Sequence, residues 1–224
     1  YLSFAATIKA GLRIPVIAVG RIEPELAEQV LRRGDADFIA MGRKLLADPE
    51  LPNKLRHGQR QAIRPCIYCY TCVSRIFVND HVRCAVNART GHEHNVMILP
   101  ATQPRHVLVV GGGPAGMEAA RVAALRGHRV TLAERGADLG GTVFFSSIVY
   151  RENGQLITYL AGQLQELGVD VRLRTSVTRE FLLALAPAAT WASITPVYQG
   201  NTAGAGFFTW TYNAQSASDQ DVKS

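Results

Sequence analysis

The sequence predicts an α/β fold with parallel strands in two separate parts of the chain, joined by a cysteine-rich segment. Three observations predict it. Apolar runs of strand length alternate with amphipathic helical patterns in residues 1–58 and again in residues 96–185. All four cysteines fall between these parts, within residues 59–95. The 224 residues, 47% of them hydrophobic, suffice for one or two domains.

The first part contains two strand–helix units. Strands are expected at 14–19 and 38–41, because both are continuous apolar runs of the kind buried on two faces. A helix should follow each strand, at 24–33 and 44–47, and the end of another helix should precede them within residues 1–12. This order is typical of the last two units of a (β/α)8 barrel.

Both predicted strands end in a Gly-Arg pair, Gly20-Arg21 and Gly42-Arg43. In such barrels the loops after the final two strands commonly hold a phosphate group. Glycine lets backbone N–H groups approach a phosphate, and Arg offers a fork of donors that matches its oxygens. We therefore predict a phosphate site there. The alternative is that the glycines merely turn the chain and the arginines are solvated, which a single pair would favour.

The four cysteines follow one compact pattern, Cys66-x-x-Cys69-x-x-Cys72, with Cys84 after eleven further residues. Three closely spaced thiolates and a fourth from a loop are typical of a cubane iron–sulfur cluster, since each iron needs one sulfur ligand. We predict that they hold a [4Fe–4S] cluster. A structural zinc site is the alternative, although zinc ribbons usually present two separated Cys-x-x-Cys knuckles. Two disulfides in so short a loop would be strained.

Residues on both sides of the cysteines give weaker signals. Residues 51–64 are polar and predicted to be irregular, and residues 87–104 are predicted to be a linker. His92 and His94 lie in that linker and are interpreted as loop residues rather than metal ligands.

A glycine-rich motif opens the part at 96–185. A strand expected at 106–110 leads into Gly111-Gly112-Gly113-Pro114-Ala115-Gly116 and a helix at 117–126. In this motif Gly111 permits a tight turn, Gly113 lets the backbone approach a pyrophosphate, and Gly116 allows close packing of helix on strand. The N-terminal end of the helix, at Pro114 and Ala115, favours negative charge. The order of elements predicts a dinucleotide-binding Rossmann unit.

An acidic residue follows at the expected distance. The strand predicted at 129–133 ends at Glu134, where an acid binds ribose hydroxyls. This favours the adenosine ribose of FAD, ADP or NAD over a 2′-phosphate. A second glycine turn, Leu139-Gly140-Gly141, is followed by a predicted helix at 155–167 and a strand at 169–173.

The combination of motifs resembles the iron–sulfur flavoprotein branch of the old yellow enzyme group, which includes 2,4-dienoyl-CoA reductase, enoate reductases and trimethylamine dehydrogenase. The segments that carry the resemblance are Met41-Gly42-Arg43, Arg64-Pro65-Cys66-Ile67-x-Cys69, Arg83-Cys84-Ala85-Val86-Asn87 and residues 109–116. It covers about residues 12–178. It implies an FMN-binding barrel, a [4Fe–4S] cluster and a domain that binds FAD or ADP.

The resemblance also implies roles for individual residues. Gly42 and Arg43, with Gly20 and Arg21, match the FMN phosphate site, and Cys66, Cys69, Cys72 and Cys84 match the cluster ligands. The positions that match the FAD contacts, together with their neighbours, are Gly113, Glu134, Arg135, Thr142 and Val177. Electrons would then pass from NAD(P)H to FAD as hydride, singly through the cluster, and on to FMN, which reduces an activated alkene.

Three departures limit what the resemblance implies. Two residues separate Cys69 and Cys72, as in trimethylamine dehydrogenase, whereas dienoyl-CoA reductase has three, so the substrate class stays open. Thr142 stands where a Gln is usual beside the FAD. The catalytic Tyr and His of the family have no counterpart in this sequence, so no catalytic residue is assigned.

The expected organisation is a fragment of a larger enzyme. Residues 96–185 would be an incomplete FAD-binding domain, and residues 186–224, with few charges and no usable periodicity, an atypical tail that is disordered or out of frame. Expected partners of the parent are NAD(P)H and a small-molecule substrate, in the cytoplasm, with no membrane and no nucleic acid, and a homo-oligomer is compatible. The alternatives are an amine dehydrogenase, an electron-transfer module without substrate chemistry, and a zinc-stabilised nucleotide-binding protein.

Overall fold

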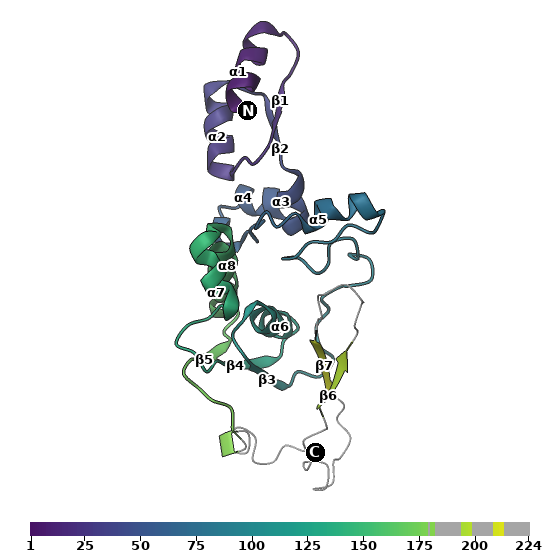
Figure 1. Cartoon of the computed structure of the whole chain (residues 1–224), viewed down its shortest axis with the longest axis vertical. Helices are drawn as coiled ribbons and strands as arrows, with labels where there is room; N and C mark the ends of the chain where they lie inside the picture. The colour runs from purple at the N-terminus through teal and green to yellow at the C-terminus, as the bar shows by residue number, and fades with distance from the viewer. Residues whose placement is uncertain (179, 182–193, 199–207, 213–224) are drawn as a thin grey trace. The chain divides into compact units, whose positions relative to one another are not determined.

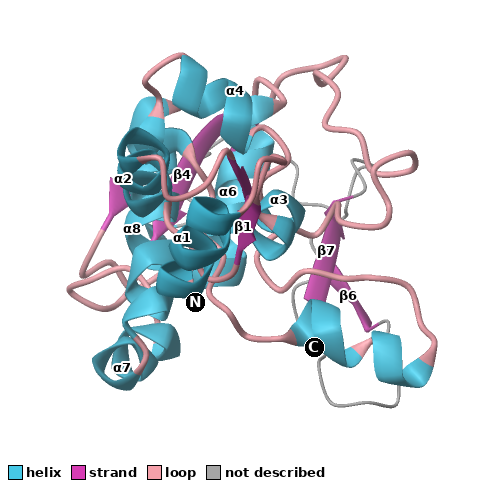
Figure 2. Cartoon of the chain, turned by 90° about the horizontal axis from the view of Figure 1, so that it is seen from above, coloured by secondary structure: helices cyan, strands magenta, loops and turns pink. Residues whose placement is uncertain are grey.

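The computed structural model describes residues 1–178, 180–181, 194–198 and 208–212 (Figure 1). The chain divides into two units, residues 1–176 and 177–224. The helices and strands, distinguished by colour in Figure 2, are α1 (Leu2–Gly11), β1 (Ile17–Val19), α2 (Pro24–Arg33), β2 (Phe38–Ala40), α3 (Gly42–Ala47), α4 (Leu51–Arg56), α5 (Thr71–Ser74), β3 (His106–Val110), α6 (Pro114–Leu125), β4 (Arg129–Ala133), α7 (Thr142–Val149), α8 (Arg151–Glu166), β5 (Asp170–Arg172), β6 (Ile194–Tyr198) and β7 (Phe208–Tyr212). Short 3-10 helices lie at Arg60–Ala62 and Ile76–Val78.

Helix α2 illustrates how the sequence sets the boundaries of an element. Pro24 begins the helix, where its missing N–H costs no hydrogen bond and its fixed φ suits the first turn. Gly34 ends it in the left-handed region, with a φ of 73°. Ala27 and Val30 form its buried face. The bounds of α2 agree with the prediction from the sequence.

The first sheet contains β1 and β2, which pair in parallel with Ile17 opposite Phe38. Ala18 is buried in a small core with Ala5 of α1 and Val30 of α2. Its neighbours Ile17 and Val19 are 62% and 68% exposed, so the expectation of burial on both faces is wrong here. Side chains alternate along a strand, and in the described residues the helices cover only the face that carries Ala18.

The segment predicted to be irregular, residues 51–64, contains α4 instead. Pro52 lies in the first turn of α4, where proline is tolerated. The ammonium of Lys54 donates to a carboxylate oxygen of Asp48 at 2.6 Å and to the carbonyl of Ala62 at 2.7 Å. These contacts tie the helix to the residues before and after it, which the polar sequence alone does not reveal. Residues 87–104, predicted to be a linker, contain no helix or strand.

The second sheet has the order β3-β4-β5, with all strands parallel. Its core is formed by buried side chains of β4, α6 and α8, including Leu132, Met117, Leu160 and Leu164. The bounds of β3 and β4 agree with the predicted strands. Helices α6 and α8 begin three or four residues earlier than predicted, at Pro114 and Arg151, and α7 was not anticipated from the sequence.

The predicted tail, residues 186–224, lies largely outside the described residues. Within it the structure describes β6 and β7, which pair in antiparallel fashion with Ile194 opposite Tyr212. The expectation of a disordered or out-of-frame tail stays a prediction.

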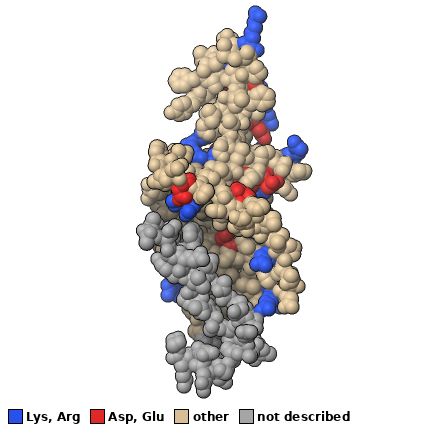
Figure 3. All heavy atoms as spheres, turned by 90° about the vertical axis from the view of Figure 1, so that its right-hand side faces the viewer, with Lys and Arg blue, Asp and Glu red and all other residues tan. Residues whose placement is uncertain are grey.

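Two surface properties bear on partners. Among the described residues, no helix combines the length and the apolar character needed to cross a membrane. On the face drawn in Figure 3, Lys and Arg side chains (blue) are interspersed with Asp and Glu side chains (red) in the part that is not grey. The expected absence of a nucleic-acid partner stays a prediction.

Candidate functional site

All four cysteines line one pocket, and all four are free thiols. The other side chains of its wall include those of Arg43, Tyr68 and Tyr70. Cys66, Cys72 and Cys84 are partly buried, whereas Cys69 is exposed. The fold therefore brings Cys84 back to the group formed by the first three cysteines. In the described part of the chain, no three His, Cys, Asp or Glu side chains lie close enough to hold a single metal ion.

Two tyrosines shape the backbone between the cysteines. Tyr68 and Tyr70 have φ values of 52° and 60°, in the left-handed region that few non-glycine residues adopt. Tyr70 immediately precedes the short helix α5, which carries Cys72. Tyr68 and Tyr70 lie on either side of Cys69, and the left-handed conformation of each one turns the backbone there. This is how three cysteines so close in sequence can face the same pocket.

The sulfurs of Cys66 and Cys84 lie in a partly desolvated but polar setting. Burial raises the pKa of Cys66, while the N–H of Tyr68 and the charges of Lys44 and Arg43 oppose that rise. Burial also raises the pKa of Cys84, and the backbone N–H groups of Val86 and Asn87 oppose that rise. Burial has the larger effect on both thiols, so the pKa of each is raised overall, and the donors and cations only reduce that rise.

Cationic side chains surround the ring of Tyr68. The guanidinium carbon of Arg21 lies 3.8 Å from the ring centre, that of Arg43 lies at 5.1 Å, and the ammonium of Lys44 lies at 5.3 Å. The Tyr68 hydroxyl donates to Glu23 at 2.8 Å, and Lys44 pairs with the same carboxylate at 2.5 Å. Although burial lowers it, the pKa of Lys44 is raised overall by Glu23 and Tyr68.

The structure thus brings the two predicted Gly-Arg pairs to the cysteine loop. Arg21, next to Gly20, also forms an ion pair with Glu152 at 3.1 Å. Arg43, next to Gly42, lies over the ring of Tyr70 at 4.7 Å. Its pKa is raised above the ordinary value, chiefly by a hydrogen bond with Tyr70. The phosphate role of these four residues stays a prediction.

One atom of Arg43 has an unusual environment. Within the described ranges its Nη1 is buried without a hydrogen-bond partner. A buried donor left unpaired costs free energy, so such an atom calls for an explanation. Because Arg43 lines the cysteine pocket, an anionic group bound there would satisfy this nitrogen.

The glycine-rich turn has the geometry that the motif predicts. Gly111 has a φ of 102°, and its N–H donates to the carbonyl of Ala133 at 2.8 Å. A Cβ on Gly116 would lie 1.9 Å from the carbonyl oxygen of Gly111, so only glycine permits this contact of helix and turn. A Cβ on Gly113 would meet nothing within 4 Å, so the space beside the turn is open. Pro114 and Ala115 begin α6 at this opening.

Glu134 lies directly beside the turn. Its carboxylate accepts from the N–H of Gly136 at 2.5 Å and from that of Gly112 at 2.6 Å. These two bonds lower the pKa of Glu134, in that order of effect, so the group is an anion at neutral pH. A ribose hydroxyl could donate to the same carboxylate.

The second glycine turn meets the first. The N–H of Gly140 donates to the carbonyl of Gly112 at 2.8 Å, and a Cβ on Gly141 would lie 3.3 Å from the Cα of Gly113. Thr142 follows at the start of α7, and Arg135 is an exposed neighbour of Glu134. Val177 belongs to residues 177–224, so its position relative to the turn is not described.

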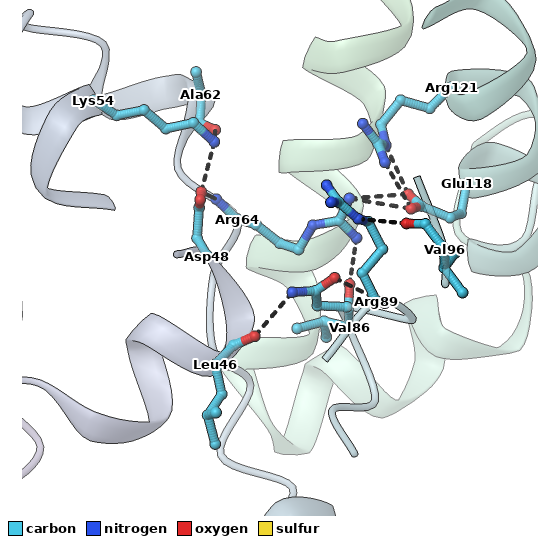
Figure 4. Close-up of polar contacts among 11 residues, drawn as sticks. Leu46, Asp48, Lys54, Ala62, Arg64, Val86, Arg89, Val96, Glu118 and Arg121 are labelled. Carbon is cyan, nitrogen blue, oxygen red and sulfur yellow. Dashed lines mark hydrogen bonds and ion pairs between the residues drawn. The ribbon is translucent and has the colours of Figure 1, made fainter. Parts of the chain in front are cut away.

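A buried polar network was missed by reasoning from the sequence. Arg64, Glu118 and Arg121 form it, and Figure 4 shows their side chains meeting between the cysteine segment and α6. Arg64 stands in a recognisable motif before Cys66, but its partner Glu118 lies 54 residues away. No local signal could have paired them.

Comparisons with known families match both parts of the chain. The NADH:flavin oxidoreductase / NADH oxidase family matches residues 1–62. The pyridine nucleotide-disulphide oxidoreductase family matches residues 86–181. The cysteines fall between the two matched ranges.

Individual relatives span both matches. The metal reductase of Desulforamulus reducens is 44% identical over 188 residues, which cover 82% of this chain and 28% of that protein. The cinnamate reductase of Clostridium sporogenes is 40% identical over 184 residues, which cover 80% of this chain and 28% of that protein. The solved structure of 2-naphthoyl-CoA reductase with 2-naphthoyl-CoA has a TM-score of 0.79 at 35% identity and covers 83% of this chain and 29% of that one. The chain spans less than a third of each.

Proposed function

Because this chain belongs to the iron–sulfur flavoproteins of the old yellow enzyme group, we propose that it carries the electron-transfer centre of an NAD(P)H-dependent flavin oxidoreductase. The family matches point to FMN and FAD as its flavins. In this proposal residues 1–58 are the last two units of an FMN-binding barrel, residues 59–95 hold the cluster, and residues 96–185 belong to the FAD-binding domain.

The observation that carries the proposal is the cysteine pocket. Four free thiols line it, which is the ligand set of a [4Fe–4S] cluster. A cluster ligated by four thiolates is anionic, and the buried, unpaired Nη1 of Arg43 lies in the wall of the same pocket. The residues present therefore fit the group. A cluster held by these four cysteines would supply one-electron transfer between the two flavins.

Residues other than the cysteines offset the charge of the thiolates and bind the two flavins. Arg43 and Lys44 offset the negative charge of the thiolates, and Tyr68 holds both cations in place through its ring. The open space beside Gly113 admits a pyrophosphate at the start of α6, where N–H groups point outward. Glu134 accepts hydrogen bonds from the adenosine ribose. Gly20, Arg21, Gly42 and Arg43 bind the FMN phosphate.

The substrate of the parent enzyme is proposed to be an activated alkene of the 2,4-dienoyl-CoA or enoate type. The relatives named as cinnamate reductase and 2-naphthoyl-CoA reductase support this choice. An amine dehydrogenase activity is the alternative, because two residues separate Cys69 and Cys72, as in trimethylamine dehydrogenase. An electron-transfer module without substrate chemistry is a third candidate. The proposal places the enzyme in the cytoplasm, with NAD(P)H as electron donor.

Anaerobic reconstitution of the chain with iron and sulfide tests the proposal. We expect about four irons and four sulfides per chain, a brown colour, and the EPR signal of a reduced cubane after dithionite. Replacing all four cysteines by serine should abolish all three. A colourless protein that holds one zinc per chain and yields no EPR signal would refute the redox function and support the structural zinc site.

A further inference from the structure

Arg64 is a buried cation at the edge of the cysteine loop. It is only 8% exposed and stands two residues before Cys66. Arginine is rarely buried unless its charge and its donors are paired. The partners of Arg64 therefore show what its burial achieves.

These partners come from several parts of the chain (Figure 4). Nη1 donates to the carbonyl of Val86, which lies two residues after Cys84. Nη2 donates to the carboxylate of Glu118, at 3.1 Å and 3.4 Å from its two oxygens. The backbone N–H of Arg64 donates to Asp48 at 2.7 Å, and the guanidinium lies over the ring of Tyr159. Arg64 thus joins the residues just before the first cysteine to those just after the last.

The bond to Val86 also bears on the sulfur of Cys84. The C=O of Val86 and the N–H of Asn87 belong to one planar trans peptide unit, in which they point in opposite directions. Arg64 holds the C=O on one side. The N–H on the other side lowers the pKa of the Cys84 thiol, so it lies near that sulfur. Fixing the carbonyl therefore fixes the direction of this N–H group.

We propose that Arg64 is a positioning residue of the cluster site, which holds Cys84 against the three other cysteines and aims the N–H of Asn87 at its sulfur. The inference rests on the proposed [4Fe–4S] cluster. Residues outside the ligand set that orient metal ligands typically change metal affinity or activity 10–100-fold when replaced. Hydrogen bonds to the sulfurs of a cluster also tune its reduction potential, because they stabilise the added negative charge of the reduced form.

The chain offers a matched control. Arg121 is 7% exposed and also bonds Glu118, with Nε and Nη2 each at 2.8 Å from a carboxylate oxygen. Among the described contacts, Arg121 makes no bond to the cysteine loop. Arg64→Met and Arg121→Met therefore both remove a buried guanidinium from Glu118, and only the first releases Val86. Arg64→Lys keeps a positive charge beside Glu118. A lysine ammonium lacks the forked donors of a guanidinium, so it cannot bond Glu118 and the carbonyl of Val86 in the same geometry.

The experiment compares wild type, R64M, R64K and R121M after anaerobic reconstitution. The readouts are iron per chain, the rate of iron loss to a chelator, and the midpoint potential from an EPR-monitored redox titration. We expect R64M to lose iron about tenfold faster and to have a lower potential, R64K to lie between R64M and wild type, and R121M to match wild type in all three readouts.

The outcomes distinguish a failure of the proposed cluster from a failure of the proposed role of Arg64. A wild-type chain that forms no cubane overturns the proposed function and the role of Arg64 with it. A wild-type chain that loads normally, with R64M equal to R121M in iron loss and in potential, overturns the role of Arg64 alone. Should R64M fail to fold by circular dichroism, R64K decides, because an unchanged potential in R64K would refute the inference and a lowered one supports it.

Discussion

Thr71 lies within hydrogen-bond distance of a predicted cluster ligand, since its Oγ1 is 3.3 Å from the sulfur of Cys69. A thiolate can only accept, so the hydroxyl donates once the sulfur is a ligand. Thr71→Val removes this donor and should lower the cluster's reduction potential by tens of millivolts, because one hydrogen bond contributes about 1 kcal/mol. An EPR-monitored redox titration measures the change. Thr71→Ser, which keeps a hydroxyl, should stay near wild type, and equal shifts in both variants would contradict the assignment.

Glu134 is the residue whose charge should decide nucleotide affinity. Glu134→Gln keeps one oxygen, which can accept from Gly112 or Gly136 but not from both, and it loses the charge that strengthens hydrogen bonds from ribose hydroxyls. We expect the Kd for ADP to rise about tenfold, or about 1.4 kcal/mol, by isothermal titration calorimetry. Asp138→Asn removes an exposed acid from the same loop and is the control. Comparable losses of affinity in both variants would show a general charge effect instead of a ribose contact.

At the scale of elements, Gly113 and Gly116 of the β3–α6 turn differ in their surroundings, so substituting each one separates an effect on folding from an effect on binding. Gly116→Ala places a methyl group 1.9 Å from the carbonyl oxygen of Gly111, so α6 must move and unfolding should become about 2 kcal/mol easier. Gly113→Ala meets nothing within 4 Å and has a φ of −71°, so stability should change by less than about 0.5 kcal/mol. Urea denaturation measures both effects.

Gly113→Ala should weaken nucleotide binding, although it leaves the stability of the fold almost unchanged. The methyl group of Gly113→Ala points into the space that a pyrophosphate would occupy, so ADP affinity should fall about tenfold or more in a protein of normal stability. Calorimetry with ADP tests this. A Gly113→Ala protein that binds ADP as wild type does would mean that the nucleotide lies elsewhere.

The elements that the sequence predicted best are those with complete local signals. The bounds of α2, β3 and β4 agree with the prediction, because an apolar run marks each strand, and a proline at the first position and a glycine after the last mark the helix. Helix α4 was missed because Lys54 anchors it through Asp48 and Ala62, residues outside the helix. The short strand β1 was predicted too long, since hydrophobicity indicates burial but does not say which neighbours pair with it.

At the scale of the whole molecule, the residues that could not be predicted are those that connect distant segments. The spacing of the cysteines predicted the ligand set, but not that Arg21 and Arg43 would lie over Tyr68. These contacts, like the pairing of Arg64 with Glu118, depend on chain segments that meet only after folding. Sequence patterns record periodicity within an element, and they do not record which elements will meet.

The pH dependence of stability tests whether the buried network holds distant segments together. Burial raises the pKa of Glu118, but Arg121 and Arg64 outweigh it and lower the pKa below the ordinary value. A group with a lowered pKa in the folded state binds more protons when unfolded. Its contribution is therefore complete above the unfolded value of about 4.3 and is lost as the pH falls through the folded value.

Glu118→Gln should accordingly cost about 2 kcal/mol of unfolding free energy at pH 7, because it removes charged hydrogen bonds to two buried arginines. The gap between wild type and Glu118→Gln should narrow as the pH falls from about 5 toward 3. Urea denaturation of the metal-free, reduced chain at several pH values measures it, with Glu166→Gln at the end of α8 as the control. A gap that stays constant across this range would mean that Glu118 is not held as an anion by Arg64 and Arg121, and the link between α6 and the cysteine segment would have to depend on other contacts.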